Sequence, residues 1–535
     1  MDSRRSAAWT SLLVVLPLVY LLLGAFHVYA GKLHVDEGSY LYGARSVYRG
    51  LLPYRDFFYL QPPVHPYVYG LIQKWAGPGL LAGRFTSLAF GFLAFLIAAA
   101  LAARLGGTEA MAIFMLFMAL NPAQIYFFTI TRLFALTGFF FSLACFLLAD
   151  RRGRFIPRLF GLAMLGLAVG TRLTVLPALL PSLYFVLRSS SQPARKWRAA
   201  AAVAVCLLVP LAIYLPFYAA APDNFFFNII GLNLSLHSRA PLQSLAAKFR
   251  TLAHLARHNY FLLVCLAAVA INGVKARRGR LRGELSAQLH HPSTVATLWA
   301  IVLIVSLGHL GAKIFQETYQ SFLNPVVMAL AAAHLARLTA GIDSPSTLRM
   351  VRATIVAGCL LTALGHGREN LQFINGMTST SLVADQAAFI KRHTGVSDAL
   401  FSADSPLLAV EADREVLPGM AGSDYFPYWP TDRCRRYHVL NDELILEYIE
   451  KRAGAMLLVG DGSFTLTLPE LEPVPLEKRE RIMTAIAEKY RLVRTDPNAH
   501  VPGTNLYFYA PEQAAAPGSP TASNGGPGSV PPTIE

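Results

Sequence analysis

Two adjacent carboxylates, Asp36 and Glu37, carry the clearest potential for chemistry in this chain. Neighbouring carboxylates repel each other and are costly to remove from water, so a pair close to a long apolar segment needs an explanation. One carboxylate of such a pair can take a proton from a hydroxyl while the other orients that hydroxyl or holds a cation. The alternative is a solvated loop start without a chemical role.

Arginines suited to phosphate binding stand at the ends of three apolar segments, at Arg84, Arg132 and Arg172. A guanidinium group offers a planar fork of donors that matches phosphate oxygens. We interpret the three arginines as a clamp for the phosphate of a donor molecule. In the alternative interpretation, each arginine only extends its charge to a membrane interface.

The carboxylate pair lies near the start of a long segment, residues 31–78, between the first two apolar runs. A connection of this length is uncommon unless it is functional or disordered. Its many Tyr and Phe side chains argue against disorder. We therefore predict that residues 31–78 form the loop that carries the catalytic site, and that the rest of the chain positions this loop.

Hydrophobic residues make up 54% of the 535 residues and charged residues only 15%. A helix needs about 20 apolar residues to cross the hydrocarbon of a bilayer. We predict a polytopic α-helical membrane domain over residues 1–368 with about 11 spans. The spans are predicted at 8–30, 79–103, 110–128, 133–149, two within 159–187, 199–218, 259–273, 294–311, 322–339 and 353–364.

The run 159–187 decides the orientation of the later loops. It is long for one span and short for two, and it is interrupted at Thr171 and Arg172. A helical hairpin here places the basic loops on the cytoplasmic side, as the positive-inside rule requires. A single span would move the two densest basic clusters outside. We prefer the hairpin, which places residues 31–78, the loop 220–258 and the C-terminal domain on the extracytoplasmic side.

Residues 369–511 have a mixed composition that predicts a small soluble α/β domain. Apolar residues recur at helical spacing in three segments, and short strand-like runs lie between them. Helices are predicted at 384–393, 441–452 and 477–490, and strands at 399–402, 455–459 and 506–510. The tail 512–535 is rich in Pro, Gly, Ser and Ala, a composition typical of disorder.

Several classes of cofactor and partner are excluded by the sequence. It contains no Gly-rich nucleotide-binding motif. The net charge of +15 is explained mostly by basic cytoplasmic loops, so we expect no nucleic-acid partner. Four of the five cysteines fall in apolar runs and no histidine pair has metal-ligand spacing, so we expect no disulfide framework and no cofactor. A divalent cation held by Asp36 and Glu37 is the alternative.

The loop after the first span resembles the first loop and second span of the GT-C membrane glycosyltransferases, in the stretches HVDEGSYLYGARSVYRG and PYRDFFYLQPPVHPYVYGLIQKWAGPGLLAGRFTSLAFG. The similar branch includes protein mannosyltransferases, aminoarabinose transferases of lipid A and lipopolysaccharide-core transferases that use polyprenyl-phosphate sugars. The resemblance implies that Asp36 is the catalytic base, with Glu37 beside it. Many members have a Lys-Pro-Pro step whose lysine touches the donor phosphate. This chain has Gln61, Pro62 and Pro63 there, and Arg55 is the candidate replacement for the lysine.

Two further segments resemble the same family. The stretch GLAVGTRLTVLP is similar to a short Thr-Lys or Thr-Arg turn between two spans, through Thr171 and Arg172, and it independently favours the hairpin. The stretch TYQSFLNPVVMALAAAHLARL is similar to a late loop-and-span motif through Tyr319 and Pro325. The resemblance covers roughly residues 8–365, the extent of the predicted spans.

The resemblance implies an enzyme that moves one sugar from a polyprenyl-phosphate donor to a hydroxyl of a lipid, glycan or protein, with inversion at the anomeric carbon. The expected residues are Asp36 and Glu37 for catalysis, Arg55, Arg84, Arg132 and Arg172 for the donor phosphate, and Tyr40, Gln61, His65 and Tyr319 for substrate. We expect a bacterial inner-membrane location, with the site on the extracytoplasmic face. The alternatives are a transporter or flippase for lipid-linked sugars and a non-catalytic assembly protein whose C-terminal domain binds glycan.

Overall fold

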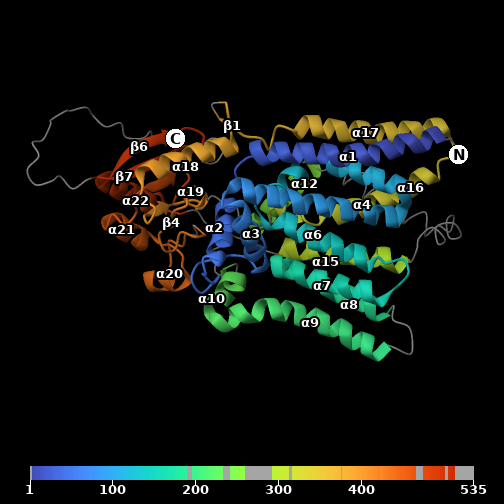
Figure 1. Cartoon of the computed structure of the whole chain (residues 1–535), viewed down its shortest axis with the longest axis horizontal. Helices are drawn as coiled ribbons and strands as arrows, with labels where there is room; N and C mark the ends of the chain where they lie inside the picture. The colour runs from blue at the N-terminus through green and yellow to red at the C-terminus, as the bar shows by residue number, and fades with distance from the viewer. Residues whose placement is uncertain are drawn as a thin grey trace, which may run out of the picture.

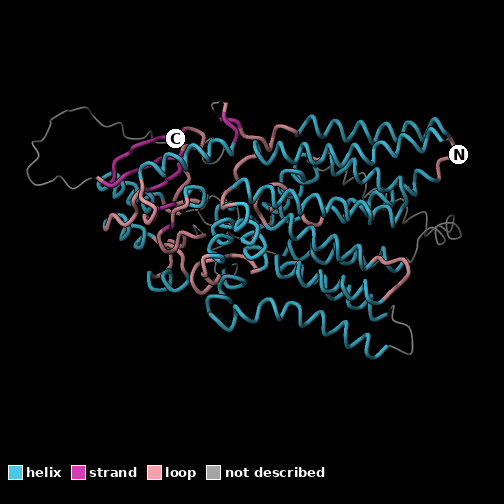
Figure 2. Tube along the Cα trace, viewed as in Figure 1, coloured by secondary structure: helices cyan, strands magenta, loops and turns pink. Residues whose placement is uncertain are grey.

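The computed structural model describes residues 3–188, 195–232, 241–258, 292–311, 316–374, 376–422, 425–465, 474–499 and 504–512. Long helices run side by side through most of the molecule, and a smaller domain stands at one end of them (Figure 1). The described strands all lie toward that end (Figure 2). Two short helices, α2 (Asp36–Tyr48) and α3 (Val64–Ala76), lie where the two parts meet.

Within the described residues, five helices are long and apolar enough to cross a membrane. Shorter apolar helices accompany them at Leu133–Leu148, Phe155–Thr171 and Leu173–Arg188. The chain is therefore an integral membrane protein. The five long helices are α1 (Ser3–Ala30), α4 (Leu80–Ala119), α9 (Arg195–Ala220), α15 (Pro292–Gly311) and α17 (Pro345–His366).

Helix α4 contains the span predicted at 79–103 and residues 110–119 of the span predicted at 110–128, whose remaining residues lie in a turn and in the separate short helix α5 (Pro122–Phe127). Helix α4 breaks at Gly107, where φ is 77° and ψ is −170°, a conformation that glycine adopts readily and other residues avoid. The rings of Phe95 and Phe114 have centroids 5.8 Å apart. The chain therefore reverses at the break, and the two halves of α4 pack against each other.

The predicted hairpin at 159–187 is confirmed. Helix α7 (Phe155–Thr171) ends before Arg172, whose backbone is extended, and the chain returns through η1 (Leu173–Ala178) and α8 (Leu179–Arg188). The guanidinium of Arg158, near the start of α7, lies 4.7 Å from the ring of Phe185, near the end of α8. This contact requires two antiparallel arms, which excludes a single span.

The remaining helices complete the membrane part and its connecting loops. They are α5 (Pro122–Phe127), α6 (Leu133–Leu148), α10 (Pro222–Phe226), η2 (Phe227–Gly231), α12 (Pro241–His258), η3 (Glu317–Gln320) and α16 (Asn324–Ala340). The span predicted at 259–273 lies outside the described residues.

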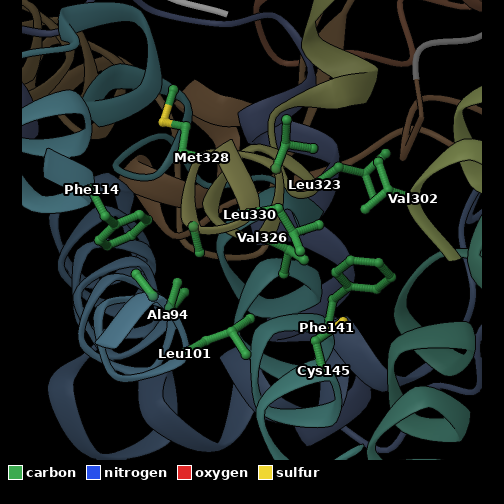
Figure 3. Packing of buried hydrophobic residues seen from close by; sticks show 14 of the residues in the cluster. Ala94, Leu101, Phe114, Phe141, Cys145, Val302, Leu323, Val326, Met328 and Leu330 are labelled. Carbon is green, nitrogen blue, oxygen red and sulfur yellow. The ribbon is translucent and has the colours of Figure 1, made fainter. Parts of the chain in front are cut away.

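The core of the membrane part lies between α4, α6, α15 and α16 (Figure 3). Ala94 and Leu101 of α4 face Leu330 of α16 across it, and Phe141 of α6 closes one side. A Cβ on Gly106 would lie 2.9 Å from the Cα of Ala333. Small residues here allow the backbones to approach closely, as is common between helices in membranes.

The C-terminal domain is built on a five-stranded mixed sheet with the strand order β4-β3-β5-β7-β6. Strand β3 is parallel to β4 and β5, whereas β7 is antiparallel to β5 and β6. The strands are β3 (Ala399–Ser402), β4 (Glu415–Val416), β5 (Leu457–Gly460), β6 (Tyr490–Asp496) and β7 (Leu506–Pro511). The helices are α18 (Ser379–His393), α19 (Leu407–Ala412), α20 (Thr431–Tyr437), α21 (Asp442–Glu450) and α22 (Leu476–Lys489). A small hairpin of β1 (Phe373–Ile374) and β2 (Met377–Thr378) joins this domain to α17.

The three helices predicted for this domain correspond to α18, α21 and α22, and the three strands to β3, β5 and β7. Strands β4 and β6 were not predicted, because β4 has only two residues and β6 follows α22 without a turn signal. Residues 513–535 of the predicted disordered tail lie outside the described part of the chain.

Candidate active site

Glu37 is fully buried and forms a two-point ion pair with Arg84. Arg84 Nε and Nη2 donate to the two carboxylate oxygens at 2.8 and 2.7 Å, and both side chains have 0% exposure. The backbone N–H of Thr131 donates to Oε1 at 3.0 Å, and that of His34 to Oε2 at 3.1 Å. Burial would raise the pKa of Glu37, but the Arg84 charge and these hydrogen bonds hold the pKa below its ordinary value. These four hydrogen bonds occupy both carboxylate oxygens, so the geometry leaves Glu37 without a free acceptor for a substrate.

The same contacts assign a structural role to Arg84, contrary to the phosphate clamp predicted from sequence. Its Nη1 donates to the carbonyls of Val28 and Gly31, each at 3.1 Å, and its Nη2 to that of Lys32 at 3.1 Å. The guanidinium therefore fastens the end of α1 and the segment that follows it to the start of α4. An arginine with its donors occupied and no exposed surface has none to offer a phosphate.

Asp36, by contrast, is partly exposed, with 38% of its side-chain surface open. Its carboxylate forms an ion pair with Arg132, whose Nη2 lies 2.7 Å from Oδ2. Burial would raise the pKa of Asp36, but the Arg132 charge holds it below its ordinary value, so Asp36 is ionised at neutral pH. The first turn of a helix favours this charge, since the helix dipole is positive there.

His34 sits between Asp36 and Arg132. Its Nε2 accepts a hydrogen bond from Arg132 Nη1 at 2.9 Å. Burial and the Arg132 charge lower the pKa of His34 to about 4, so the ring is neutral at pH 7. Its Nδ1 faces Asp36, at 3.2 Å from the backbone nitrogen and 3.9 Å from the carboxylate of that residue. Sequence reasoning assigned no role to His34, although it stands only two positions before Asp36.

Arg172 lies beside this group, on the turn between α7 and η1. Its guanidinium lies 4.6 Å from the ring centre of Tyr319 and 5.6 Å from that of Phe134. The guanidinium of Arg132 lies 4.7 Å from the same Phe134 ring. Burial raises the pKa of the Tyr40 phenol, on which the nearby charges of Arg132, Asp36 and Arg172 also act. The fold thus brings Asp36, Arg132 and Arg172 into one region, although Asp36 and Arg172 are more than 130 positions apart in the chain.

Among the described residues, Arg172 makes no ion pair. Its Nε donates to Thr174 Oγ1 at 3.2 Å, and no hydrogen bond within the described structure occupies Nη1 or Nη2. Thr174 Oγ1 also lies 2.8 Å from His309 Nε2, and Gln320 Nε2 lies 3.3 Å from His309 Nδ1. This chain of polar contacts fixes the direction of the Arg172 side chain. Thr174, two positions after the Thr-Arg turn, was not predicted from the sequence.

Three other predicted residues stand apart from the carboxylate. Arg55 is half exposed and pairs with Asp56 at 2.8 Å, so the structure does not support it as a phosphate ligand of this site. Gln61 is joined to Tyr54 through its backbone carbonyl at 2.7 Å. His65 is buried, stacks on Tyr69 at a centroid distance of 4.0 Å and meets Tyr40 edge-on at 4.9 Å. His65 therefore packs against the ring of Tyr40.

A cavity of about 30 Å³ lies between the segment around His34, which lines it, and the C-terminal domain. Its lining includes Leu33, Val35, Asp404 and Ser405. The volume is enough for about one water molecule and far too small for a sugar. Among the described residues, no group of three or more His, Cys, Asp or Glu could hold a metal ion. Independence from metal stays a prediction.

Several solved structures have a similar fold, an oligosaccharyltransferase among them. No protein-family model and no curated protein matches the sequence. ArnT from Cupriavidus metallidurans bound to undecaprenyl phosphate has a TM-score of 0.60 and 12% identity, covering 96% of this chain and 99% of that chain. Its apo state has a TM-score of 0.57 and 14% identity, covering 95% and 98%. The Archaeoglobus fulgidus oligosaccharyltransferase tethered with an acceptor peptide has a TM-score of 0.50 and 11% identity, covering 94% of this chain and 74% of that chain. These likenesses show that the chain has the GT-C glycosyltransferase fold.

Proposed function

We propose that this chain is a membrane glycosyltransferase that moves a single sugar from a polyprenyl-phosphate donor to a hydroxyl group of an acceptor. The observation that carries the proposal is the contrast between the two neighbouring carboxylates. Glu37 is buried and fully hydrogen-bonded, whereas Asp36 is ionised, partly exposed and paired with Arg132. Arg172, whose guanidinium lies over the ring of Tyr319, makes no ion pair with any residue that the structure describes. An ionised, partly exposed carboxylate beside an arginine that makes no ion pair among the described residues is suited to transfer from a phosphate ester.

In the proposed reaction, Asp36 takes the proton of the acceptor hydroxyl as its oxygen attacks the anomeric carbon. The bond between that carbon and the phosphate oxygen breaks, and the polyprenyl phosphate leaves with the bonding electrons. Arg172 and Arg132 stabilise the charge that develops on the leaving phosphate, because charge-assisted hydrogen bonds strengthen as that charge grows. Attack from the side opposite the phosphate inverts the anomeric carbon.

Support for the donor class comes from the similar structures. ArnT from Cupriavidus metallidurans was solved with undecaprenyl phosphate bound. The phosphate ligands proposed for this chain are Arg172 and Arg132, whose guanidinium groups lie over the same Phe134 ring; Arg132 also pairs with Asp36. Arg84 has all its donors occupied in the protein interior, and Arg55 pairs with Asp56. The acceptor is a lipid, glycan or protein on the extracytoplasmic face of a bacterial inner membrane.

Donor profiling of the purified chain in lipid, with a panel of polyprenyl-phosphate sugars, tests the proposal. Asp36→Asn keeps the shape of the side chain and removes the base, so turnover should fall about 10²- to 10⁴-fold. Binding of undecaprenyl phosphate should persist in this variant. Arg172→Met should weaken that binding as well as slow transfer.

Asp56→Asn is the matched control, because Asp56 is a carboxylate of the same loop that pairs with Arg55 away from Asp36. It should transfer at the wild-type rate. Transfer by Asp36→Asn at near the wild-type rate would remove Asp36 from the mechanism. Movement of a lipid-linked sugar across the bilayer without transfer by the wild type would favour the transporter alternative.

A further inference from the structure

The helix that begins with Asp36 is packed against the C-terminal domain along its length. Tyr40, Leu41 and Tyr42 belong to the same buried cluster as Leu400 and Leu407 of that domain. In Figure 1, α2 lies next to α19 and β4 at the junction of the two parts of the molecule. The helix that carries the base is therefore as much a part of the domain's core as of the membrane part.

The closest contact is at Gly38, two residues after Asp36. A Cβ at this position would lie 2.2 Å from Ser405 Oγ, 2.4 Å from the backbone nitrogen of Leu407 and 2.9 Å from the Leu407 Cα. Glycine is unfavourable inside a helix, where alanine is the best residue. Its presence in the first turn of α2 is explained by the Ser405–Leu407 backbone, which leaves no room for a methyl group.

Ser405 also holds the other side of the carboxylate pair. Its Oγ donates to the carbonyl of Val35 at 2.8 Å. One residue of the domain thus contacts both Val35 and Gly38, the positions that flank Asp36 and Glu37. From the opposite side, Arg84 of the membrane part holds Glu37.

The far end of α2 is held by the segment that follows α19. The side chain of Arg45 is buried and donates to the carbonyl of Arg414 at 2.7 Å. Tyr42 Oη donates to Glu415 Oε2 at 2.7 Å, and Arg49 forms ion pairs with Asp413 and Glu415. With both ends of the helix fixed, the helix cannot shift unless the domain shifts with it.

We propose that the C-terminal domain positions Asp36 for the reaction, through the contact of Ser405 and Leu407 with Val35 and Gly38. This inference rests on the proposed role of Asp36 as the base. A displacement of about 1 Å of a group that must meet reacting atoms can cost about 100-fold in rate. The domain is thus a functional part of the active site although none of its residues touches the reacting atoms in this assignment.

The test is the full-length chain in lipid carrying Gly38→Ala, with Gly462→Ala as the matched control. The new methyl group at position 38 must push the Leu407 backbone away, whereas a Cβ at Gly462 meets nothing within 4 Å. We expect kcat to fall about 10- to 100-fold in Gly38→Ala, with little change in the affinity for undecaprenyl phosphate. Gly462→Ala should keep the wild-type kcat. A folded Gly38→Ala variant with the wild-type kcat would overturn the proposal.

Ser405→Ala decides the question if Gly38→Ala does not fold. It removes the hydrogen bond to Val35 without adding volume, and it should lower kcat severalfold at an unchanged donor KM, at a temperature where the variant is fully folded. A merely structural Ser405 would instead lower the melting temperature and leave kcat unchanged, which would contradict the proposal. Failure of the proposed function is distinguishable, since the wild type itself would then transfer no sugar.

Discussion

Replacing Glu37 with Gln should destabilise the protein rather than remove a catalytic group. The two carboxylate oxygens accept four hydrogen bonds, from Arg84 Nε and Nη2 and from the backbone amides of Thr131 and His34. An amide group keeps only one acceptor oxygen. Whichever way the Gln side chain turns, its NH₂ group faces one Arg84 donor and one backbone N–H.

The size of the effect follows from the burial of the pair. Both side chains have 0% exposure, so the positive charge of Arg84 stays buried without its counter-ion. Breaking a buried ion pair from one side costs about 3–5 kcal/mol. Asp36→Asn is the comparison: the Asp36 side chain is 38% exposed, so water reaches this pair and its loss should destabilise the protein less than Glu37→Gln does.

The assay is thermal unfolding of the purified variants in detergent, followed across pH. The pKa of Glu37 is lowered in the folded state, so its contribution to stability is complete above its ordinary pKa of 4.5 and is lost as the pH falls through the folded value. The wild type should therefore lose stability below pH 4.5, and Glu37→Gln should lack this part of the decline. A Glu37→Gln variant with the melting temperature of the wild type but no turnover would refute the structural role. Glu37 would then be a catalytic residue.

Three further predictions concern the phosphate side, metal and topology. Thr174→Val removes the oxygen that orients Arg172 and should weaken undecaprenyl phosphate binding about 3- to 10-fold in a direct binding assay, whereas Thr174→Ser should restore it; unchanged binding in Thr174→Val would contradict the role of Thr174. Transfer should persist in a chelator of divalent cations, and activity that is lost and then restored by magnesium or manganese would place a cation at Asp36 instead. A cysteine introduced at Val396, which is 80% exposed, should react from outside the cell with a membrane-impermeant thiol reagent. Cys434 should not react, because it is buried and its pKa is raised to about 12, and labelling of the Val396→Cys variant only from the cytoplasm would reverse the orientation.

The sequence was sufficient for features that depend on local chain properties. The apolar runs predicted the helical membrane part, because crossing a bilayer requires a long run of apolar residues. The break at Arg172 and the distribution of basic loops predicted the hairpin that α7 and α8 form. Helical and strand periodicity located α18, α21 and α22 and three of the five strands of the main sheet. The adjacent carboxylates and the resemblance around them pointed to Asp36 and to the fold.

Only the tertiary structure showed which residues of the same type are available to a substrate and which are bonded within the protein. Asp36 and Glu37 are neighbours in the sequence, but consecutive side chains of a helix point about 100° apart. One therefore faces the open side near Arg132, and the other is buried against Arg84. The sequence alone does not distinguish the arginines as phosphate ligands, because their neighbours are unknown. In the fold, Arg84 and Arg55 have carboxylate partners, whereas Arg172 has none among the described residues. The contact between Gly38 and Ser405 joins positions 367 residues apart, a distance over which no local pattern in a single sequence carries information.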